Sequence, residues 1–474
     1  MLTTDDSCEP TAARSARNDR LVHAFVWSVW IGMLVLLIWS MVPVVSRVPL
    51  AEDWYLVAPL TGHEPDLAAW LWAQNNEHRT PLARAVMLGT IEAARGDFRA
   101  GCYVNAAFLA LTAAGLIVFV RRMRGSTDPA DAAFPLLLMH FGHSHQVLFT
   151  WLLLFVMATV VTICLGCALF ARESVASPGA AASAGIALLL LPLCGMNGLL
   201  FVPAPAAYLL YAGWRCSSGS RGWPARPAVG RWLIASASGA VVLSAIYFLG
   251  YEQPWWNPPN PGVVPSVKTA LKVLSLGFGP ASALWWAPGV AAATLLYSAS
   301  LWRAWRNVVE RHGIDREYAL GAALFLANAI GFAWVLGWAR AGYVPDFGIP
   351  IRYVLAVVPA VIASYMTWEK SASSVGRLVQ RSLAAGMLIL VPLNTIAGHR
   401  LFADWYHEGM QRVEADIHAG VPISTLAVRH QKFLVHWWSP SELERHMRML
   451  REAGVAPFDR ARDPLRATDG DGSR

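Results

Sequence analysis

Long apolar segments separated by short polar ones form the main pattern of this chain. Each apolar segment runs for about 18–24 residues with almost no charge, which is enough to cross a hydrocarbon core of about 30 Å as a helix. A helix in the core of a soluble protein rarely needs such a run. The pattern therefore predicts an all-α fold, a polytopic bundle of transmembrane helices.

We expect about eleven spans. The first is too long for the apolar region of a signal peptide and no small-residue cleavage site follows it, so it is expected to remain as a helix. The third, fifth and sixth are short for a bilayer. The expected spans are Ala24–Val45, Gly101–Val120, Ala132–Phe141, Val147–Phe170, Ala182–Gly195, Gly198–Gly213, Trp232–Leu249, Ala281–Leu301, Tyr318–Trp338, Tyr353–Trp368 and Ser382–Gly398.

The distribution of basic residues predicts the sidedness of the chain. Arginines precede the first span and fill nearly every second connection, so the positive-inside rule puts the N-terminus in the cytoplasm. This divides the chain into a cytoplasmic tail (1–23), a transmembrane domain (24–398) and a periplasmic C-terminal tail (399–474). A first outer loop with helical segments is expected over 46–100, and the location is expected to be a bacterial inner membrane.

Composition agrees with a membrane protein and excludes other classes. Hydrophobic residues make up 55% of the chain and charged residues 15%, against about 25% charged in soluble domains. The net charge of +7 is concentrated between the spans, so we interpret it as a topology signal and expect the bilayer, not nucleic acid, as partner. The six cysteines show neither a disulfide framework nor the spacing of a metal site.

Two adjacent carboxylates follow the first span closely. Glu52 and Asp53 precede Trp54 and Tyr55, within a few residues of the expected membrane surface. A carboxylate at this place can take a proton from an incoming hydroxyl group and so activate it as a nucleophile. The alternative is a solvated loop in which Asp53 caps a helix. Asp53 and Glu52 are therefore candidate catalytic residues, and which of them would act stays open.

A second polar cluster lies just before a helix start in the same outer loop. Thr80 followed by Pro81 is typical of a helix N-terminus, where free N–H groups favour an anion. Glu77, His78 and Arg79 directly precede it, and His78 and Arg79 could bind a phosphate through charge-assisted hydrogen bonds. The alternative is a polar surface turn.

Further candidates fall on the same expected side. Arg340, Arg352 and Tyr353 flank the loop between the ninth and tenth spans, where the arginines either bind a lipid-linked phosphate or extend to lipid headgroups. His140, His143 and His145 cluster at another outer turn, but their spacing matches no strong metal signature. We therefore assign no metal ligands, and a divalent metal stays open as a cofactor.

The interiors of the spans contain almost no ionisable residues. Proton-coupled and ion-coupled transporters usually need such groups near the middle of the membrane. In this chain the ionisable residues are concentrated at the expected outer surface instead, which favours chemistry at the membrane interface. Four tryptophans, Trp255, Trp256, Trp285 and Trp286, are expected either in the membrane interface or along a carbohydrate groove.

This layout resembles the type C glycosyltransferase superfamily, multi-span enzymes that depend on a lipid-linked sugar. The matching parts are the acidic pair Glu52-Asp53, the partly amphipathic segment Glu64–Arg99 and the outer tail His399–Arg474. The chain is also similar to uncharacterised bacterial membrane proteins with an Asn-Glu-His-Arg string and a late Arg-Tyr pair, here Asn76–Arg79 and Arg352-Tyr353. The resemblance to the superfamily implies a polyprenyl-phosphate-linked sugar as donor, an inverting displacement and an acidic general base.

The resulting hypothesis is a membrane glycosyltransferase that moves a sugar from a polyprenyl-phosphate donor to an envelope glycan or lipid acceptor at the outer face of the inner membrane. In it, Asp53 or Glu52 is the base, Arg79, Arg340 and Arg352 hold the donor phosphate, and His78 and Glu77 assist. The alternatives are a transporter or flippase of a lipid-linked glycan and a non-enzymatic envelope assembly protein.

Overall fold

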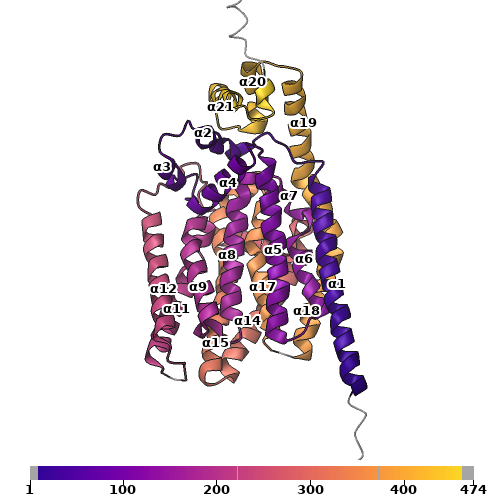
Figure 1. Cartoon of the computed structure of the whole chain (residues 1–474), viewed down its shortest axis with the longest axis vertical. Helices are drawn as coiled ribbons and strands as arrows, with labels where there is room; N and C mark the ends of the chain where they lie inside the picture. The colour runs from indigo at the N-terminus through magenta and orange to yellow at the C-terminus, as the bar shows by residue number, and fades with distance from the viewer. Residues whose placement is uncertain (1–8, 221, 372, 462–474) are drawn as a thin grey trace, which may run out of the picture.

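The chain folds as an all-α polytopic bundle, with long helices standing side by side (Figure 1). The computed structural model describes residues 9–220, 222–371 and 373–461. The helices of the bundle are α1 (Glu9–Met41), α5 (Arg99–Arg124), α6 (Ala133–Leu138), α8 (Leu153–Phe170), α9 (Pro178–Leu190), α11 (Pro203–Ser218), α12 (Pro227–Tyr247), α13 (Val263–Ser275), α14 (Trp286–Glu310), α15 (Gly313–Arg340), α17 (Val354–Glu369) and α18 (Ser374–Gly398).

In the described part of the chain, seven helices are long and apolar enough to cross a membrane. They correspond to seven of the expected spans. Of the other four, the fifth, sixth and eighth coincide with α9, α11 and α14, so about eleven crossings stays a prediction. The third, Ala132–Phe141, is folded as the short helices η2 (Pro129–Ala132), α6 and η3 (Phe141–His143). Its side chains are buried by other helices, which is where irregular backbone is tolerated at membrane depth.

Many of the shorter elements, together with the C-terminal helices, lie at the end of the bundle opposite the start of α1 (Figure 1). The first outer loop and the C-terminal helices thus lie at the same end, and the side of the membrane that this end faces stays a prediction. The elements are η1 (Ala51–Leu56), α2 (Val57–Leu60), α3 (Leu67–Trp72), α4 (Pro81–Ala93), α7 (Ser144–Val147), η4 (Thr150–Leu152), α10 (Met196–Leu199), α16 (Val344–Phe347), η10 (Ile351–Tyr353), the π-helix η11 (His399–Ala403), α19 (Asp404–His418), α20 (Ile423–Leu434) and α21 (Pro440–Glu452).

The C-terminal helices pack on the first outer loop through aromatic contacts. The ring centroid of Tyr55 lies 5.3 Å from that of Trp438, and that of Trp54 lies 5.8 Å from that of Phe458. Trp437 Nε1 donates a hydrogen bond to the Tyr55 hydroxyl over 3.1 Å. Together α19–α21 therefore form a folded cover over η1.

A network of charged side chains connects the helices at the end of the bundle away from the first outer loop. The Arg124 guanidinium donates to both oxygens of Asp131 at 3.0 and 3.1 Å and to both oxygens of Glu369 at 3.0 and 2.6 Å. The Tyr365 hydroxyl donates to Asp131 over 2.7 Å, and Gln380 Nε2 donates to Glu369 over 2.9 Å. One guanidinium thus links α5 with η2 and α17.

We expect Arg124→Met to lower the stability of the bundle strongly. The change leaves the carboxylates of Asp131 and Glu369 buried without their cation, which costs about 3–5 kcal/mol. Thermal unfolding in detergent measures the effect, and the exposed Arg377→Met is the control for the loss of one charge. Equal melting temperatures for the two variants would show that the network does not fasten this end.

Candidate functional site

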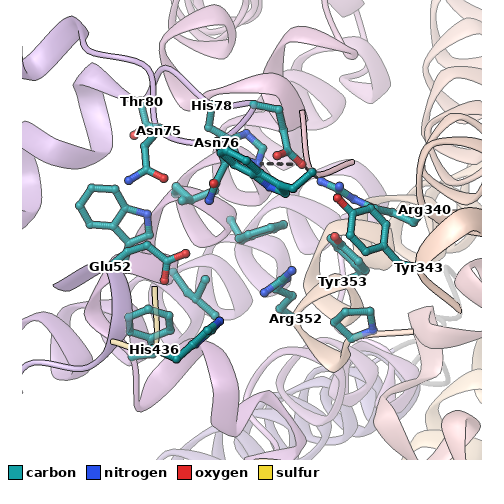
Figure 2. A pocket seen from close by; sticks show the side chains of 18 residues that line it. Glu52, Asn75, Asn76, His78, Thr80, Arg340, Tyr343, Arg352, Tyr353 and His436 are labelled. Carbon is teal, nitrogen blue, oxygen red and sulfur yellow. Dashed lines mark ion pairs between the residues drawn. The ribbon is translucent and has the colours of Figure 1, made fainter. Parts of the chain in front are cut away.

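A cavity of about 440 Å³ opens at the end of the bundle that carries the first outer loop. Its walls come from η1, the segment before α4, the start of α8, and the loop between α15 and α17 (Figure 2). Segments far apart in the sequence thus meet in one space. The lining residues are Glu52, Asn75, Asn76, Glu77, His78, Thr80, Phe149, Trp151, Leu152, Leu154, Phe155, Trp256, Arg340, Tyr343, Pro350, Arg352, Tyr353 and His436.

The two adjacent carboxylates of η1 point in different directions. Successive residues of a 3₁₀ helix are about 120° apart, so neighbouring side chains diverge. The Glu52 carboxylate faces the cavity (Figure 2), whereas Asp53 is buried behind it and does not line it. Asp53 Oδ1 accepts a hydrogen bond from the backbone N–H of Trp151 over 2.8 Å. Asp53 therefore binds the backbone of η4 from a buried position, which differs from the cap in a solvated loop that the sequence offered as the alternative.

Burial acts on the proton affinity of both carboxylates. Burial raises the pKa of the Glu52 carboxyl above its usual value, while a backbone hydrogen bond and the charge of Arg352 oppose this rise. Burial raises the pKa of Asp53 as well, and the backbone N–H donors of Trp151 and Leu50 oppose it. The proton affinity of Glu52 is thus raised at a position that a bound molecule can reach.

A tight turn carries the second group of lining residues. The backbone N–H of Asn75 donates to the carbonyl of His78 over 2.8 Å, and that of His78 donates back to Asn75 over 2.9 Å. Asn76 has φ +50°, a left-handed conformation that asparagine adopts more readily than most residues. The Tyr247 hydroxyl donates to the Glu77 carbonyl over 2.8 Å and accepts from the Arg79 N–H over 3.1 Å. These bonds fix the turn against α12.

Arg79 supports this turn from behind and does not line the cavity. Its guanidinium donates to three backbone carbonyls, that of Trp72 at 3.1 Å and those of Leu249 and Gly250 at 3.0 Å each. The buried cation thus ties the segment before α4 to the end of α12. This geometry favours a structural role for Arg79 over contact with a ligand.

His78 is held in one orientation and one protonation state. Its Nδ1 accepts a hydrogen bond from the backbone N–H of Met196 over 3.2 Å. Burial, together with the charge of Arg352, lowers the pKa of His78 to about 4. At neutral pH the ring is therefore neutral and carries its proton on Nε2, so it can donate a hydrogen bond into the cavity. A Cβ at Gly195 would come within 3.2 Å of Nδ1, so glycine at this position permits the contact.

Two arginines form the opposite side of the cavity (Figure 2). Arg340, the last residue of α15, pairs with the Glu77 carboxylate and lies 5.5 and 5.9 Å from the ring centroids of Tyr343 and Tyr353. The Arg352 guanidinium lies 5.6 Å from the Tyr353 ring centroid, and Gln146 Nε2 donates to the Arg352 carbonyl over 2.8 Å. Of these two arginines, Arg340 thus already has a carboxylate partner.

Aromatic side chains form much of the remaining wall. Phe149 and Trp151 come from the segment at η4 just before α8, Phe155 comes from the first turn of α8, and Trp256 comes from the loop after α12. Trp255, Trp285 and Trp286, which were expected either in the membrane interface or along a carbohydrate groove, do not line this cavity.

Sequence reasoning missed Tyr343 and His436. Tyr343 follows Arg340 by three residues, a spacing that could have indicated it. His436 comes from the C-terminal unit, and nothing in its local sequence connects it with the first outer loop.

The outer histidines lie apart from this cavity. His140 and His143 are buried and stacked with ring centroids 4.3 Å apart, and His143 Nε2 lies 3.0 Å from the Leu137 carbonyl. His145 stacks on Phe402 at 4.1 Å. Across the described residues, no group of three or more histidine, cysteine, aspartate or glutamate side chains is arranged to hold a metal ion.

No protein-family model and no curated protein matches this sequence. Among solved structures, the chain is similar to the crystal structure of ArnT from Cupriavidus metallidurans in the apo state, with a TM-score of 0.43 and 16% sequence identity. The similarity covers 95% of this chain and 76% of that chain. The chemistry of the cavity therefore rests on its own geometry.

Arg79 and Arg352 have different surroundings, so we expect their substitution to change the stability of the protein by different amounts. Arg79→Met leaves three backbone carbonyls without their charged donor, so we expect a loss of about 3 kcal/mol. Arg352→Met removes a cation that faces the cavity and is expected to change the melting temperature far less. Thermal unfolding of the two variants in the same detergent tests this, and a larger loss for Arg352→Met would contradict the assignment.

Proposed function

We propose that this chain is a membrane glycosyltransferase that moves a sugar from a polyprenyl-phosphate donor to an envelope glycan or lipid acceptor at the outer face of a bacterial inner membrane. The proposal is based mainly on one cavity, in which the Glu52 carboxylate lies opposite the guanidinium groups of Arg352 and Arg340. The volume of about 440 Å³ falls within the range of about 300–1,000 Å³ typical of ligand pockets. The resemblance of the sequence to type C glycosyltransferases supports the same activity.

The charged side of the cavity suits the donor phosphate. Arginine matches phosphate oxygens through paired N–H donors, and neutral His78 adds a further donor at Nε2. As the bond between the anomeric carbon and the phosphate oxygen breaks, negative charge grows on the leaving phosphate. Donors already fixed in place stabilise that charge in the transition state. The aromatic wall offers flat apolar surfaces for the faces of a sugar ring.

Of the acidic residues near the cavity, Glu52 suits the role of general base best. The Asp53 carboxylate is occupied by backbone N–H groups, and the Glu77 carboxylate is occupied by Arg340. Glu52 faces the cavity, and burial raises its pKa, which strengthens it as a proton acceptor. In the proposed step, the acceptor hydroxyl passes its proton to Glu52 as its oxygen bonds to the anomeric carbon, and the polyprenyl phosphate departs. Attack from the side opposite the phosphate inverts that carbon.

Glu52→Gln is expected to lower sugar transfer by about 10²–10⁴-fold, because a positioned base typically contributes that much. The melting temperature and the binding of donor lipid should stay close to wild type. The assay follows a labelled sugar from a panel of polyprenyl-phosphate donors to envelope acceptors, with purified protein in nanodiscs. Glu92→Gln, an exposed carboxylate on α4, is the matched control and should retain full transfer.

Other outcomes of that assay would overturn parts of the proposal. Wild-type transfer by both Glu52→Gln and Asp53→Asn would place the base elsewhere. If the wild-type protein transfers no sugar but moves lipid-linked glycans across vesicles, the transporter alternative holds. EDTA in the same assay tests whether a divalent metal takes part.

The pH dependence of transfer gives an independent prediction. The base must be deprotonated, so kcat/KM should fall as the pH decreases through the raised pKa of Glu52, above the usual glutamate value of about 4.3. His78, with a pKa of about 4, stays neutral over most of this range. His78→Gln should therefore lower the rate and keep the acid limb of the profile. Loss of that limb in His78→Gln would assign the titration to the histidine.

A further inference from the structure

A second hollow lies at the opposite end of the bundle, between α1 and α5. The two helices are in contact where Trp30 Nε1 donates to the Ala110 carbonyl over 2.9 Å. Farther from the candidate cavity, toward the start of α1 and the end of α5, they enclose a hollow of about 390 Å³. Its apolar part is formed by Trp27, Ile117 and Val118, and its basic part by His23, Arg121 and Arg122.

The order of these side chains along the helices follows membrane depth. Ile117 and Val118 lie one turn before Arg121 and Arg122, which occupy the last turn of α5. The helix ends there because Gly125 adopts a left-handed conformation with φ +86°. Arginines at the end of a spanning helix extend toward the headgroups, and their charge suits the C-terminal end of the helix dipole. The hollow therefore has an apolar wall toward the membrane interior and a basic wall at the surface.

The carboxylates nearby pair with only one of these two arginines. Asp19 lies 4.0 Å from Arg121, and its Oδ1 accepts from the backbone N–H of Thr127 over 3.0 Å. Asp131 and Glu369 are engaged by Arg124. Among the side chains that the structure describes, no carboxylate forms a salt bridge with the exposed Arg122. Positive charge therefore remains beside the hollow.

The hollow also borders the lipid. Only 17% of the apolar stretch of α1 is buried in the protein, and Leu21, Phe25 and Val118 are exposed to 62%, 51% and 37%. A molecule that fits must offer an anion at headgroup depth and hydrocarbon just below it. Membrane-facing pockets of this kind bind anionic lipid headgroups.

We propose that this hollow binds one anionic phospholipid of the leaflet at this end. Its phosphate lies beside Arg121 and Arg122, and the upper part of an acyl chain lies along Trp27 and Val118. The site is independent of the proposed transferase activity, because its residues belong to the other end of the bundle.

Native mass spectrometry of detergent-purified protein titrated with phosphatidylglycerol tests this site. We expect one bound lipid per chain, with the affinity lowered about thirtyfold in the double variant R121Q/R122Q, since each arginine contributes about 1 kcal/mol near a charged surface. The matched control is R172Q/R316Q, which removes two exposed arginines with the same loss of charge. Unchanged size-exclusion profiles show that both variants remain folded.

Comparison ligands decide between an anionic lipid and other occupants. Phosphatidylcholine should bind much more weakly, and inorganic phosphate at millimolar concentration should not displace phosphatidylglycerol. Equal binding of both lipids, displacement by inorganic phosphate, or equal losses in the two double variants would each overturn the proposal.

Discussion

The hydrogen bond from the Trp151 backbone N–H to the Asp53 carboxylate is the contact on which the geometry of the cavity depends. It joins the first outer loop to η4, which directly precedes α8. Because Asp53 is fixed behind the wall, its neighbour in the 3₁₀ turn is directed into the cavity. Of the acidic pair, Asp53 thus holds the loop in place, and Glu52 is positioned to contact a ligand. The aromatic contacts of Trp438 and Phe458, from the C-terminal segment, with Tyr55 and Trp54 also hold this loop.

Much of the fold could be predicted from the sequence because the bilayer imposes simple rules. Length and apolarity identified the long helices, while the sidedness that the basic clusters indicate stays a prediction. These rules work poorly for Ala132–Phe141, because its short helices are buried by protein. Its backbone is not exposed to lipid, so it need not form one continuous helix. The folding of residues 404–452 into three helices over the loop depends on tertiary aromatic contacts, which no local pattern reveals.

The sequence suggested which residues form the candidate site, and the structure shows which of these residues line one cavity. Glu52, Glu77, His78, Arg340, Arg352 and Tyr353 meet in one cavity, although they come from distant segments. Asp53 and Arg79 have the same chemical types as their neighbours but are engaged by the backbone, and a sequence does not show the direction of a side chain. Likewise, the Glu77–Arg340 pair arises only when the turn before α4 meets the end of α15. The sequence could therefore suggest which residue types take part, but not which carboxylate remains available.

The central claim is that a lipid-linked sugar phosphate binds between the arginines and Glu52. A cryo-electron microscopy structure with a non-hydrolysable polyprenyl-phosphate sugar tests it most directly. We expect the phosphate against the Arg352 guanidinium and the sugar between it and the Glu52 carboxylate, with the anomeric carbon facing Glu52. A phosphate bound outside this cavity, or a sugar that leaves Glu52 remote from the anomeric carbon, would contradict it.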